Sequence, residues 1–243
     1  MNVILTLPFS NSLIKMDKIK PGKAYVLLSG GQDSFVSLLW ALQTFESIED
    51  VSINYGQSHS KELSYAANIA KQFNIKHTLY DIGSFFNIMT TSSLLNKGDH
   101  NIKHSLAAEL PASFVPNRNG IFLTIISNHA FKNGEKQIHL VIGACETDYS
   151  GYPDCRNNYM KAKQLELSLG LDRPVSIHTP LMWKSKAEIF EMAYNAGKLK
   201  ELIELTLTCY NGVETLNDWG RGCGECPACK LRKKGFEEFS KSI

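Results

Sequence analysis

The stretch Tyr25-Val26-Leu27-Leu28-Ser29-Gly30-Gly31-Gln32-Asp33-Ser34 decides the fold. The apolar run from Ala24 to Leu28, which opens this stretch, has the length and composition of a strand that is covered on both faces. The residues from Phe35 to Trp40 continue with helical spacing, and Asp33 or Ser34 is expected to cap that helix. The stretch therefore predicts a buried strand, a glycine-rich turn and a helix in direct succession.

The turn has the features of a phosphate site. Gly30 and Gly31 allow backbone torsions closed to other residues and let a ligand approach the main chain. Unpaired amides at a helix start attract a phosphate or pyrophosphate, and the hydroxyls of Ser29 and Ser34 are further donors. The alternative is an ordinary glycine turn between a strand and a helix. A Walker loop is excluded, because no Gly-Lys-Ser/Thr follows at the required spacing.

Apolar runs and helical patterns alternate along the rest of the chain. This alternation predicts an α/β fold with a doubly wound, mostly parallel sheet whose ligands bind at the carboxyl ends of the strands. The expected strands are 24–28, 51–55, 76–82, 137–143 and 175–178, with helices at 63–73, 119–131, 158–169 and a further one ending near Tyr194. Residues 87–118 have little regular pattern and are interpreted as a long functional loop or lid.

Composition indicates a globular chain of 243 residues with 43% apolar residues and a net charge of +2. That charge gives no general reason to expect a nucleic-acid or membrane partner. The apolar run near the start is too short to cross a bilayer and lacks a signal-peptide pattern, so we expect a cytoplasmic protein. Three parts are expected: an extension (1–22), a nucleotide-binding domain (23–205) and a metal-binding segment (206–243).

Four cysteines gather near the end of the chain. Cys223, Cys226 and Cys229 are separated by two residues each, and Cys209 precedes them by thirteen intervening residues. Four thiolates at this spacing suit a closed tetrahedral zinc site, with Gly222 and Gly224 freeing the backbone around it. An iron–sulfur cluster is the alternative. Cys145 is expected to be a packed small residue, whereas Cys155 lies in a polar loop where it could act as a nucleophile or help to position a ligand.

Several motifs together carry a family resemblance that spans about residues 23 to 236. They are Ser-Gly-Gly-Gln-Asp-Ser at 29–34, Tyr-Gly-Gln-Ser-His at 55–59 with Glu62, Cys-Glu-Thr-Asp-Tyr-Ser-Gly-Tyr-Pro-Asp-Cys-Arg at 145–156, Thr-Pro-Leu-Met-Trp at 179–183, and the terminal cysteines. The first resembles the pyrophosphate loop of ATP-pyrophosphatases, and the set resembles the 7-cyano-7-deazaguanine synthase family.

The resemblance implies conversion of 7-carboxy-7-deazaguanine and ammonia into a nitrile precursor of queuosine, through adenylated carboxylate and amide intermediates. It implies ATP and Mg²⁺ as cofactors, one structural Zn²⁺ per chain, a homodimer, and no stable nucleic-acid partner. Asp33, Ser34, Arg118 and Lys186 become candidate catalytic residues. Arg118 and Lys186 would neutralise phosphate or carboxylate charge, although each alone could be a surface cation.

The resemblance also assigns binding residues. The nucleotide segment is Leu28, Ser29, Gly30, Gly31, Gln32, Asp33, Ser34, Phe35, Val36, Ser37 and Leu38. The expected substrate contacts are His59, Glu146, Asp148, Tyr152, Asp154 and Arg156. The acids would accept hydrogen bonds from the base, and a tyrosine would stack on it.

The chain departs from the family pattern at three places. Ser58 stands where arginine is usual, and Asn117 stands where glycine is usual. Residues 214–219 form an insertion between Cys209 and Cys223. None of these removes an expected metal ligand or a residue of the pyrophosphate loop, so we expect the activity to be kept while ligand affinity is affected.

Two other functions compete with this interpretation. A related ATP-pyrophosphatase could modify tRNA by inserting sulfur with an iron–sulfur cluster, and iron analysis would separate it from a zinc protein. A non-catalytic nucleotide sensor or nucleic-acid-binding zinc module could keep the fold, but Asp33 and both loop glycines are present.

Overall fold

The computed structural model describes residues 22–57, 60–85, 103–104, 107–146 and 151–243. Most of the expected N-terminal extension and much of the expected lid at 87–118 lie outside these described residues. No helix in the described part of the chain is long and apolar enough to cross a membrane.

A five-stranded sheet forms the centre of the molecule, in the order β3-β2-β1-β6-β7. Its strands are β1 (Lys23–Leu27), β2 (Ser47–Asn54), β3 (Lys76–Asp81), β6 (Ile138–Val141) and β7 (Val175–His178). All four neighbouring pairs are parallel. Along the chain, strands are added from β1 toward β3 on one side of the sheet and from β6 to β7 on the other. This is the doubly wound topology, so the predicted fold class is confirmed.

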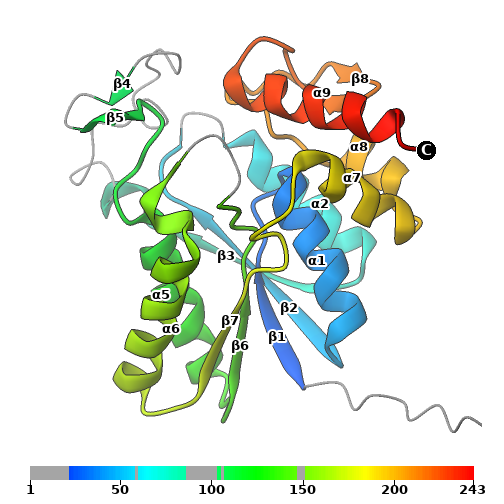
Figure 1. Ribbon diagram of the computed structural model, residues 1–243. Coiled ribbons are helices and arrows are strands. Elements are labelled where there is room, and N and C mark those ends of the chain that lie inside the picture. Colours follow the sequence, from blue (N-terminus) through cyan, green and yellow to red (C-terminus); the bar gives the residue numbers. More distant parts are fainter. Residues whose placement is uncertain (1–21, 58–59, 86–102, 105–106, 147–150) are drawn as a thin grey trace, which may run out of the picture.

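Helices cover both faces of this sheet (Figure 1). The main helices are α1 (Gln32–Thr44), α2 (Lys61–Gln72), α5 (Arg118–Lys132), α6 (Asn157–Leu171), α7 (Lys186–Asn195), α8 (Leu199–Leu205) and α9 (Pro227–Ser240). Shorter elements are β4 (Lys103–His104), β5 (Ala107–Pro111), η1 (Pro153–Cys155), β8 (Leu216–Asn217) and β9 (Gly220–Arg221). Figure 1 places α5 and α6 on one face, and α1, α2 and α7 on the other.

Strand β1 lies between two apolar cores. Tyr25 and Leu27 pack into the cluster that includes Leu123 of α5 and Met160 of α6. Val26 belongs to the opposite cluster, with the helices of the other face. Side chains alternate across a strand, so an uninterrupted apolar run is what a strand buried on both faces requires. The prediction from this run is confirmed.

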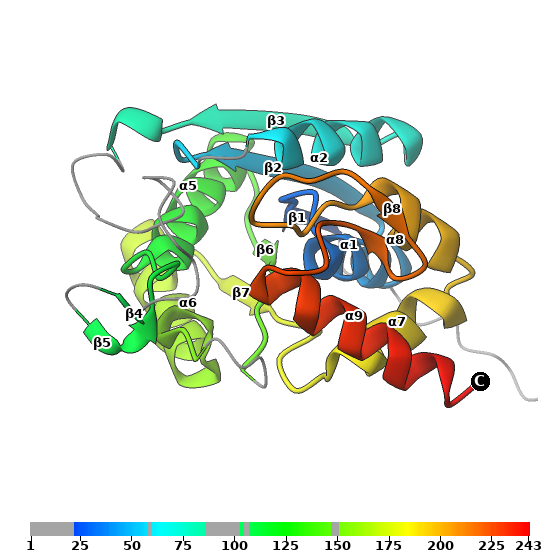
Figure 2. The ribbon, with the colours of Figure 1, turned by 90° about the horizontal axis from the view of Figure 1, so that it is seen from above.

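The C-terminal segment lies over the carboxyl ends of the strands (Figures 1 and 2). Helix α9 packs on α7, where the Phe190 ring meets Phe236 edge-on at 5.3 Å. Arg232 of α9 is buried and donates hydrogen bonds to the carbonyls of Trp219 and Leu202, both at 2.9 Å. These contacts hold the cysteine-bearing loop against α8.

Two local expectations are wrong. Helix α1 is capped by Gly31 in an extended conformation without a side-chain hydrogen bond, so neither Asp33 nor Ser34 caps it. Strand β2 begins at Ser47, four residues before the expected start at 51. The sequence pattern missed this part because Glu49 and Asp50 are acidic, yet both are fully buried.

Glu49 is buried at the amino-terminal half of the sheet with three basic partners. Its carboxylate lies 2.6 Å from Lys23 Nζ, 3.0 Å from Lys76 Nζ and 2.7 Å from His129 Nε2. Burial by itself would raise the pKa of Glu49, but the hydrogen bonds from Lys23, His129 and Lys76 outweigh burial and lower the pKa to about 2.

We expect the free energy of unfolding to fall as pH is lowered from about 4.5 to about 2, because Glu49 becomes protonated over this range. The lowered pKa means that the folded state favours the ionised form, so the stabilisation is present above the unfolded-state pKa and is lost as pH falls toward the folded-state value. The loss is at most about 3 kcal/mol. Urea unfolding at pH 6 and pH 3 would measure it, and Glu49→Gln should show a smaller difference between the two pH values. An equal difference in both proteins would contradict the assignment.

Candidate active site

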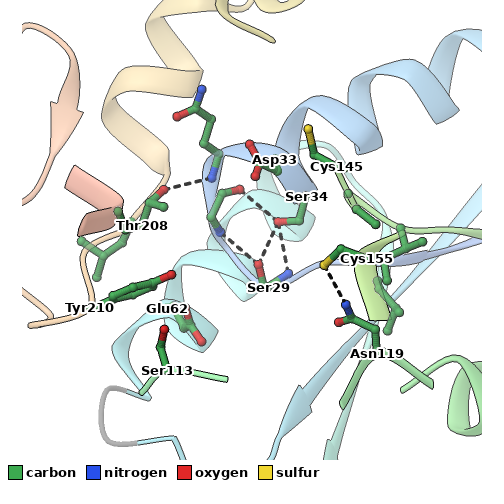
Figure 3. Close-up of a pocket in the computed structure, with 18 of the residues that line it drawn as sticks. Ser29, Asp33, Ser34, Glu62, Ser113, Asn119, Cys145, Cys155, Thr208 and Tyr210 are labelled. Carbon is green, nitrogen blue, oxygen red and sulfur yellow. Dashed lines mark hydrogen bonds between the residues drawn. The ribbon is translucent and has the colours of Figure 1, made fainter. Parts of the chain in front are cut away.

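A cavity of about 860 Å³ opens at the carboxyl ends of the strands, beside the point where the strand order reverses between β1 and β6. Its walls come from the loop after β1, the end of β2, the start of α5, the loop after β6, residues 207–210 and α9. Figure 3 shows these side chains converging from segments distant in the sequence. Ligands of doubly wound sheets bind in this crevice.

The glycine turn predicted as a phosphate site forms one wall. Gly30 has φ +87°, and a Cβ there would lie 2.1 Å from the carbonyl oxygen of Glu62, so only glycine fits between the loop and α2. Ser34 Oγ accepts from the Ser29 amide at 3.2 Å and lies 3.1 Å from Ser29 Oγ. These contacts hold the turn in place at the start of α1 (Figure 3).

The C-terminal segment is attached directly to this turn. The amide of Leu207 donates to the Gly30 carbonyl at 2.9 Å, and the Gln32 amide donates to Thr208 Oγ1 at 3.2 Å. Thr208 and Tyr210 flank Cys209, and all three line the cavity. The cysteine-bearing segment is therefore part of the wall of the site.

Asp33 and Lys186 form an ion pair at the cavity, with Lys186 Nζ 2.7 Å from Asp33 Oδ2. The Lys186 side chain is 10% exposed, so it is not a surface cation. Within the described residues, Asp33 Oδ1 and both polar atoms of the Gln32 side chain are buried without a hydrogen-bond partner. Buried polar atoms of this kind usually meet a ligand, ion or water.

Arg118 lies at the start of α5 on the opposite wall. Its Nη1 donates to Tyr55 Oη at 3.3 Å, and among the described residues its buried Nε has no hydrogen-bond partner. The guanidinium also lies over the Tyr55 ring, 5.5 Å from the centroid. A partly buried cation in a cavity wall can bind an anionic ligand.

Tyr152 is the predicted substrate residue that lines the cavity. Its hydroxyl lies 2.6 Å from Ser113 Oγ, and its ring stacks on Phe114 with centroids 6.0 Å apart. The end of the expected lid and the polar loop at 145–156 therefore meet at this wall, to which Tyr152 contributes an aromatic side chain.

The other expected substrate contacts have different positions. Asp154 Oδ2 accepts from the Asn119 amide and Glu146 Oε2 from the Asn157 amide, both at 2.9 Å, at the starts of α5 and α6. Arg156 Nη2 donates to the Gly151 carbonyl at 3.5 Å. These three do not line the cavity. His59 and Asp148 lie outside the described residues.

The expected nucleotide segment divides into two parts. Leu28, Ser29, Gly31, Gln32, Asp33 and Ser34 line the cavity, and Gly30 supplies backbone to the same turn. Phe35, Val36, Ser37 and Leu38 are buried and do not line it. Sequence reasoning gave no role to Glu62, Thr208, Tyr210 or Lys230, which do line it. The signal in the sequence that could have identified Thr208 and Tyr210 is their position on either side of Cys209, a predicted metal ligand.

Glu62 is a half-buried residue whose side chain lines the cavity wall. Burial raises the pKa of Glu62 to about 7, against the opposing effects of the Arg118 charge and a hydrogen bond from Gln57. Gln57 Nε2 donates to Glu62 Oε1 at 3.2 Å, and Gln57 Oε1 accepts from the Tyr55 amide at 3.0 Å. A carboxyl group held this way can exchange a proton near neutral pH.

The sulfur atoms of Cys209, Cys223, Cys226 and Cys229 form one cluster, as predicted. These atoms all lie within 4.8 Å of one another, so the cluster could hold a metal ion. Gly222 packs against it, because a Cβ there would lie 2.4 Å from Cys229 Sγ. Cys145 and Cys155 are outside the cluster and line the cavity, where Cys145 Sγ donates to the Lys184 carbonyl at 3.2 Å.

The fold and the site define a phosphate-loop α/β protein with a four-cysteine cluster beside its ligand cavity. Residues 23–240 match the family model described as queuosine biosynthesis protein QueC. The chain belongs to this family. It is 43% identical over 221 residues to 7-cyano-7-deazaguanine synthase of Bacillus subtilis (strain 168), covering 91% of this chain and 96% of that protein. The corresponding enzyme of Lysinibacillus sphaericus (strain C3-41) is 46% identical, with 91% and 97% covered.

Solved structures with a similar arrangement are more distant in sequence. A 4-thiouridine synthetase–RNA complex with bound ATP has a TM-score of 0.49 and 17% identity, covering 91% of this chain and 50% of that one. An NH3-dependent NAD synthetase from Campylobacter jejuni has a TM-score of 0.46 and 12% identity, covering 78% and 69%.

Proposed function

We propose that this chain converts 7-carboxy-7-deazaguanine and ammonia into 7-cyano-7-deazaguanine at the expense of ATP. The observation that carries the proposal is the single cavity that joins the glycine loop and the Asp33–Lys186 pair to a wall bearing Arg118 and Tyr152. One end suits a triphosphate and the other a flat, anionic ligand. Two relatives that share over 40% of their residues with nearly the whole chain carry this enzyme name.

The chemistry requires activation of a carboxylate, which is a poor electrophile. Attack of the carboxylate oxygen on the α-phosphorus of ATP releases pyrophosphate and forms an acyl adenylate. Ammonia then displaces AMP to form an amide. Adenylation of the amide oxygen by a second ATP, followed by loss of AMP and the remaining N–H protons, forms the nitrile. Both halves use the same ATP site.

The residues at the loop suit the phosphates. The start of α1 faces the cavity, and the Ser29 and Ser34 hydroxyls, which bond to each other at 3.1 Å, would turn to donate to phosphate oxygens. Asp33 Oδ1 is buried without a partner in the described part of the chain, and a carboxylate oxygen is a ligand that Mg²⁺ prefers. Mg²⁺ bound there would share the negative charge of the triphosphate, and Lys186 would offset it further.

The opposite wall suits the base. Tyr152 offers a ring for stacking, and Arg118 offers positive charge to the carboxylate of the substrate. Asp154 and Glu146 hold the starts of α5 and α6, so their contribution is to position this wall. His59 and Asp148 remain candidates for direct contact with the base.

Zinc is the metal we propose for Cys209, Cys223, Cys226 and Cys229. Zn–S bonds of about 2.3 Å in a tetrahedron place the sulfurs about 3.8 Å apart. The Cys223 and Cys229 sulfurs are 3.9 Å apart, and all four lie within 4.8 Å of one another. An iron–sulfur cluster would need more space between them, so this geometry favours a single structural ion over the cluster of a sulfur-inserting enzyme.

The proposal extends to the organisation of the protein. The protein would be a cytoplasmic homodimer without a stable nucleic-acid partner. Each chain would be divided into an extension (1–22), a nucleotide-binding domain (23–205) and a zinc-binding segment (206–243). Size-exclusion chromatography with light scattering would test the dimer.

The test is incubation with 7-carboxy-7-deazaguanine, ammonium, Mg²⁺ and α-labelled ATP, with nitrile followed by mass and AMP by chromatography. We expect both products, and at least a roughly 10²-fold loss of both in Asp33→Ala, since Asp33 lies where charge develops on the phosphate. Circular dichroism would show that the variant remains folded. AMP formation without nitrile would contradict the proposed substrate but would support the adenylating chemistry. If folded wild-type protein formed neither product, the proposed enzymatic activity would be contradicted.

A further inference from the structure

The proposed reaction leaves one proton transfer without an assigned residue. Ammonia occurs near neutral pH mainly as ammonium, which has no lone pair with which to attack an acyl adenylate. The site therefore needs a group that takes a proton from ammonium close to the adenylate carbonyl. Such a group must be anionic when ammonium arrives, must lie in the cavity and must be able to hold the proton afterwards.

Glu62 meets the positional requirement. Its main-chain carbonyl packs against Gly30 so closely that a Cβ there would lie 2.1 Å away, which places this residue beside the phosphate loop. Its side chain lines the cavity, and Figure 3 draws it next to the loop in the same part of the view as Tyr210 and Ser113. The carboxyl group thus lines the space in which the adenylate would form, with its own main chain against the glycine loop and Arg118 of the opposite wall within electrostatic reach.

The surroundings of Glu62 favour proton exchange. Gln57 donates one hydrogen bond to it at 3.2 Å, and Arg118 on α5 and Tyr55 after β2 are the charged or titratable groups that act on it. The pKa of Glu62 is raised to about 7, mainly by burial. A partly buried carboxylate that lines a cavity attracts a small cation, and a group with a pKa near the working pH is suited to accept and release a proton.

We propose that Glu62 is the general base that converts bound ammonium into ammonia. This inference rests on the proposed function. One N–H bond of ammonium breaks as an O–H bond forms on the Glu62 carboxylate. The nitrogen lone pair then forms the C–N bond at the adenylate carbonyl, and the attached nitrogen loses a second proton to water. AMP leaves with the electron pair of the bond between the carbonyl carbon and the bridging oxygen, which yields the neutral amide. The proton returns from Glu62 to solvent before the next cycle.

Glu62→Gln tests the proposal, because glutamine keeps the shape and can still accept the hydrogen bond from Gln57. Exchange of labelled pyrophosphate into ATP, dependent on 7-carboxy-7-deazaguanine, measures adenylation without ammonium. We expect this exchange to stay within about twofold of wild type, whereas formation of amide and nitrile from ammonium at pH 7 falls by roughly 10²-fold. The loss should shrink as pH is raised, because free ammonia then becomes available without the base.

Glu237→Gln is the matched control, because Glu237 on α9 has a side chain that is 56% exposed and lies away from the cavity wall. Wild-type rates of amide formation in Glu62→Gln would overturn the inference. A parallel fall in exchange and in amide formation, unaffected by pH, would also overturn it and would assign Glu62 to nucleotide binding. Absence of carboxylate-dependent exchange in the wild-type enzyme would contradict the proposed function itself, and the inference would fall with it.

Discussion

Replacing Gly30 with alanine is expected to abolish activity and to lower the free energy of unfolding by about 2–5 kcal/mol. The residue has φ +87°, a conformation that strains any side chain, and the added Cβ would meet the backbone of α2 at Glu62 O (2.1 Å) and Ala66 N (2.9 Å). Backbone cannot rotate away as a side chain can, so the loop and α2 must separate. Urea unfolding and the assay for AMP and nitrile would measure the two effects.

Gly134 offers a matched control for this substitution. It has φ +85°, but a Cβ there would meet nothing within 4 Å. Gly134→Ala therefore carries the conformational strain without the clash, and we expect a loss of only about 1 kcal/mol with activity kept. If Gly30→Ala were no more destabilising than Gly134→Ala, or if it remained active, the close contact between the phosphate loop and α2 would not matter for folding or catalysis.

Replacing Cys226 with serine is expected to remove the metal and most of the activity. Cys226 is buried in the cluster, and a serine hydroxyl is a poor replacement for a thiolate ligand. Binding of a structural metal contributes directly to folding, so we expect a loss of about 4 kcal/mol or more. Residues 207–210 line the cavity and bond to the phosphate loop, so disorder around the cysteines would reach the active site.

Metal analysis by mass spectrometry, thermal unfolding and the nitrile assay would measure these effects together. Cys145→Ser is the control for metal content, because Cys145 lies outside the four-sulfur cluster. We expect it to keep one zinc per chain. Zinc retained at full occupancy in Cys226→Ser, or iron in place of zinc in the wild-type protein, would contradict the proposed centre.

Much of the architecture follows from local patterns in the sequence. The apolar run of β1, the glycine turn and the start of α1 are consecutive, and their periodicity and composition are enough to predict a strand, a phosphate loop and a helix. Alternation of strands and helices then predicts the parallel, doubly wound sheet. The cysteine cluster was predictable for the same reason, since three of its members lie within seven residues.

Buried charge was not predictable in this way. Glu49 lies in the middle of a strand, and its burial depends on Lys23, Lys76 and His129, which come from three other elements. A local pattern therefore treats Glu49 as exposed. The same limit applies to Asp154, whose acidic side chain in a polar loop suggests contact with a base, whereas its partner is the amide that begins α5.

The sequence by itself determined the phosphate loop, the sheet class and the four possible metal ligands, because each depends on residues close together in the chain. Only the tertiary structure decided that Thr208 and Tyr210 complete the cavity, that Arg232 anchors the cysteine segment, and that Glu62 lies beside Gly30. These contacts join segments separated by tens of residues or more, and they arise when chain folding brings the carboxyl ends of the strands, α2 and the C-terminal segment together. The environment that raises the pKa of Glu62 is a product of that assembly, since burial is its main cause.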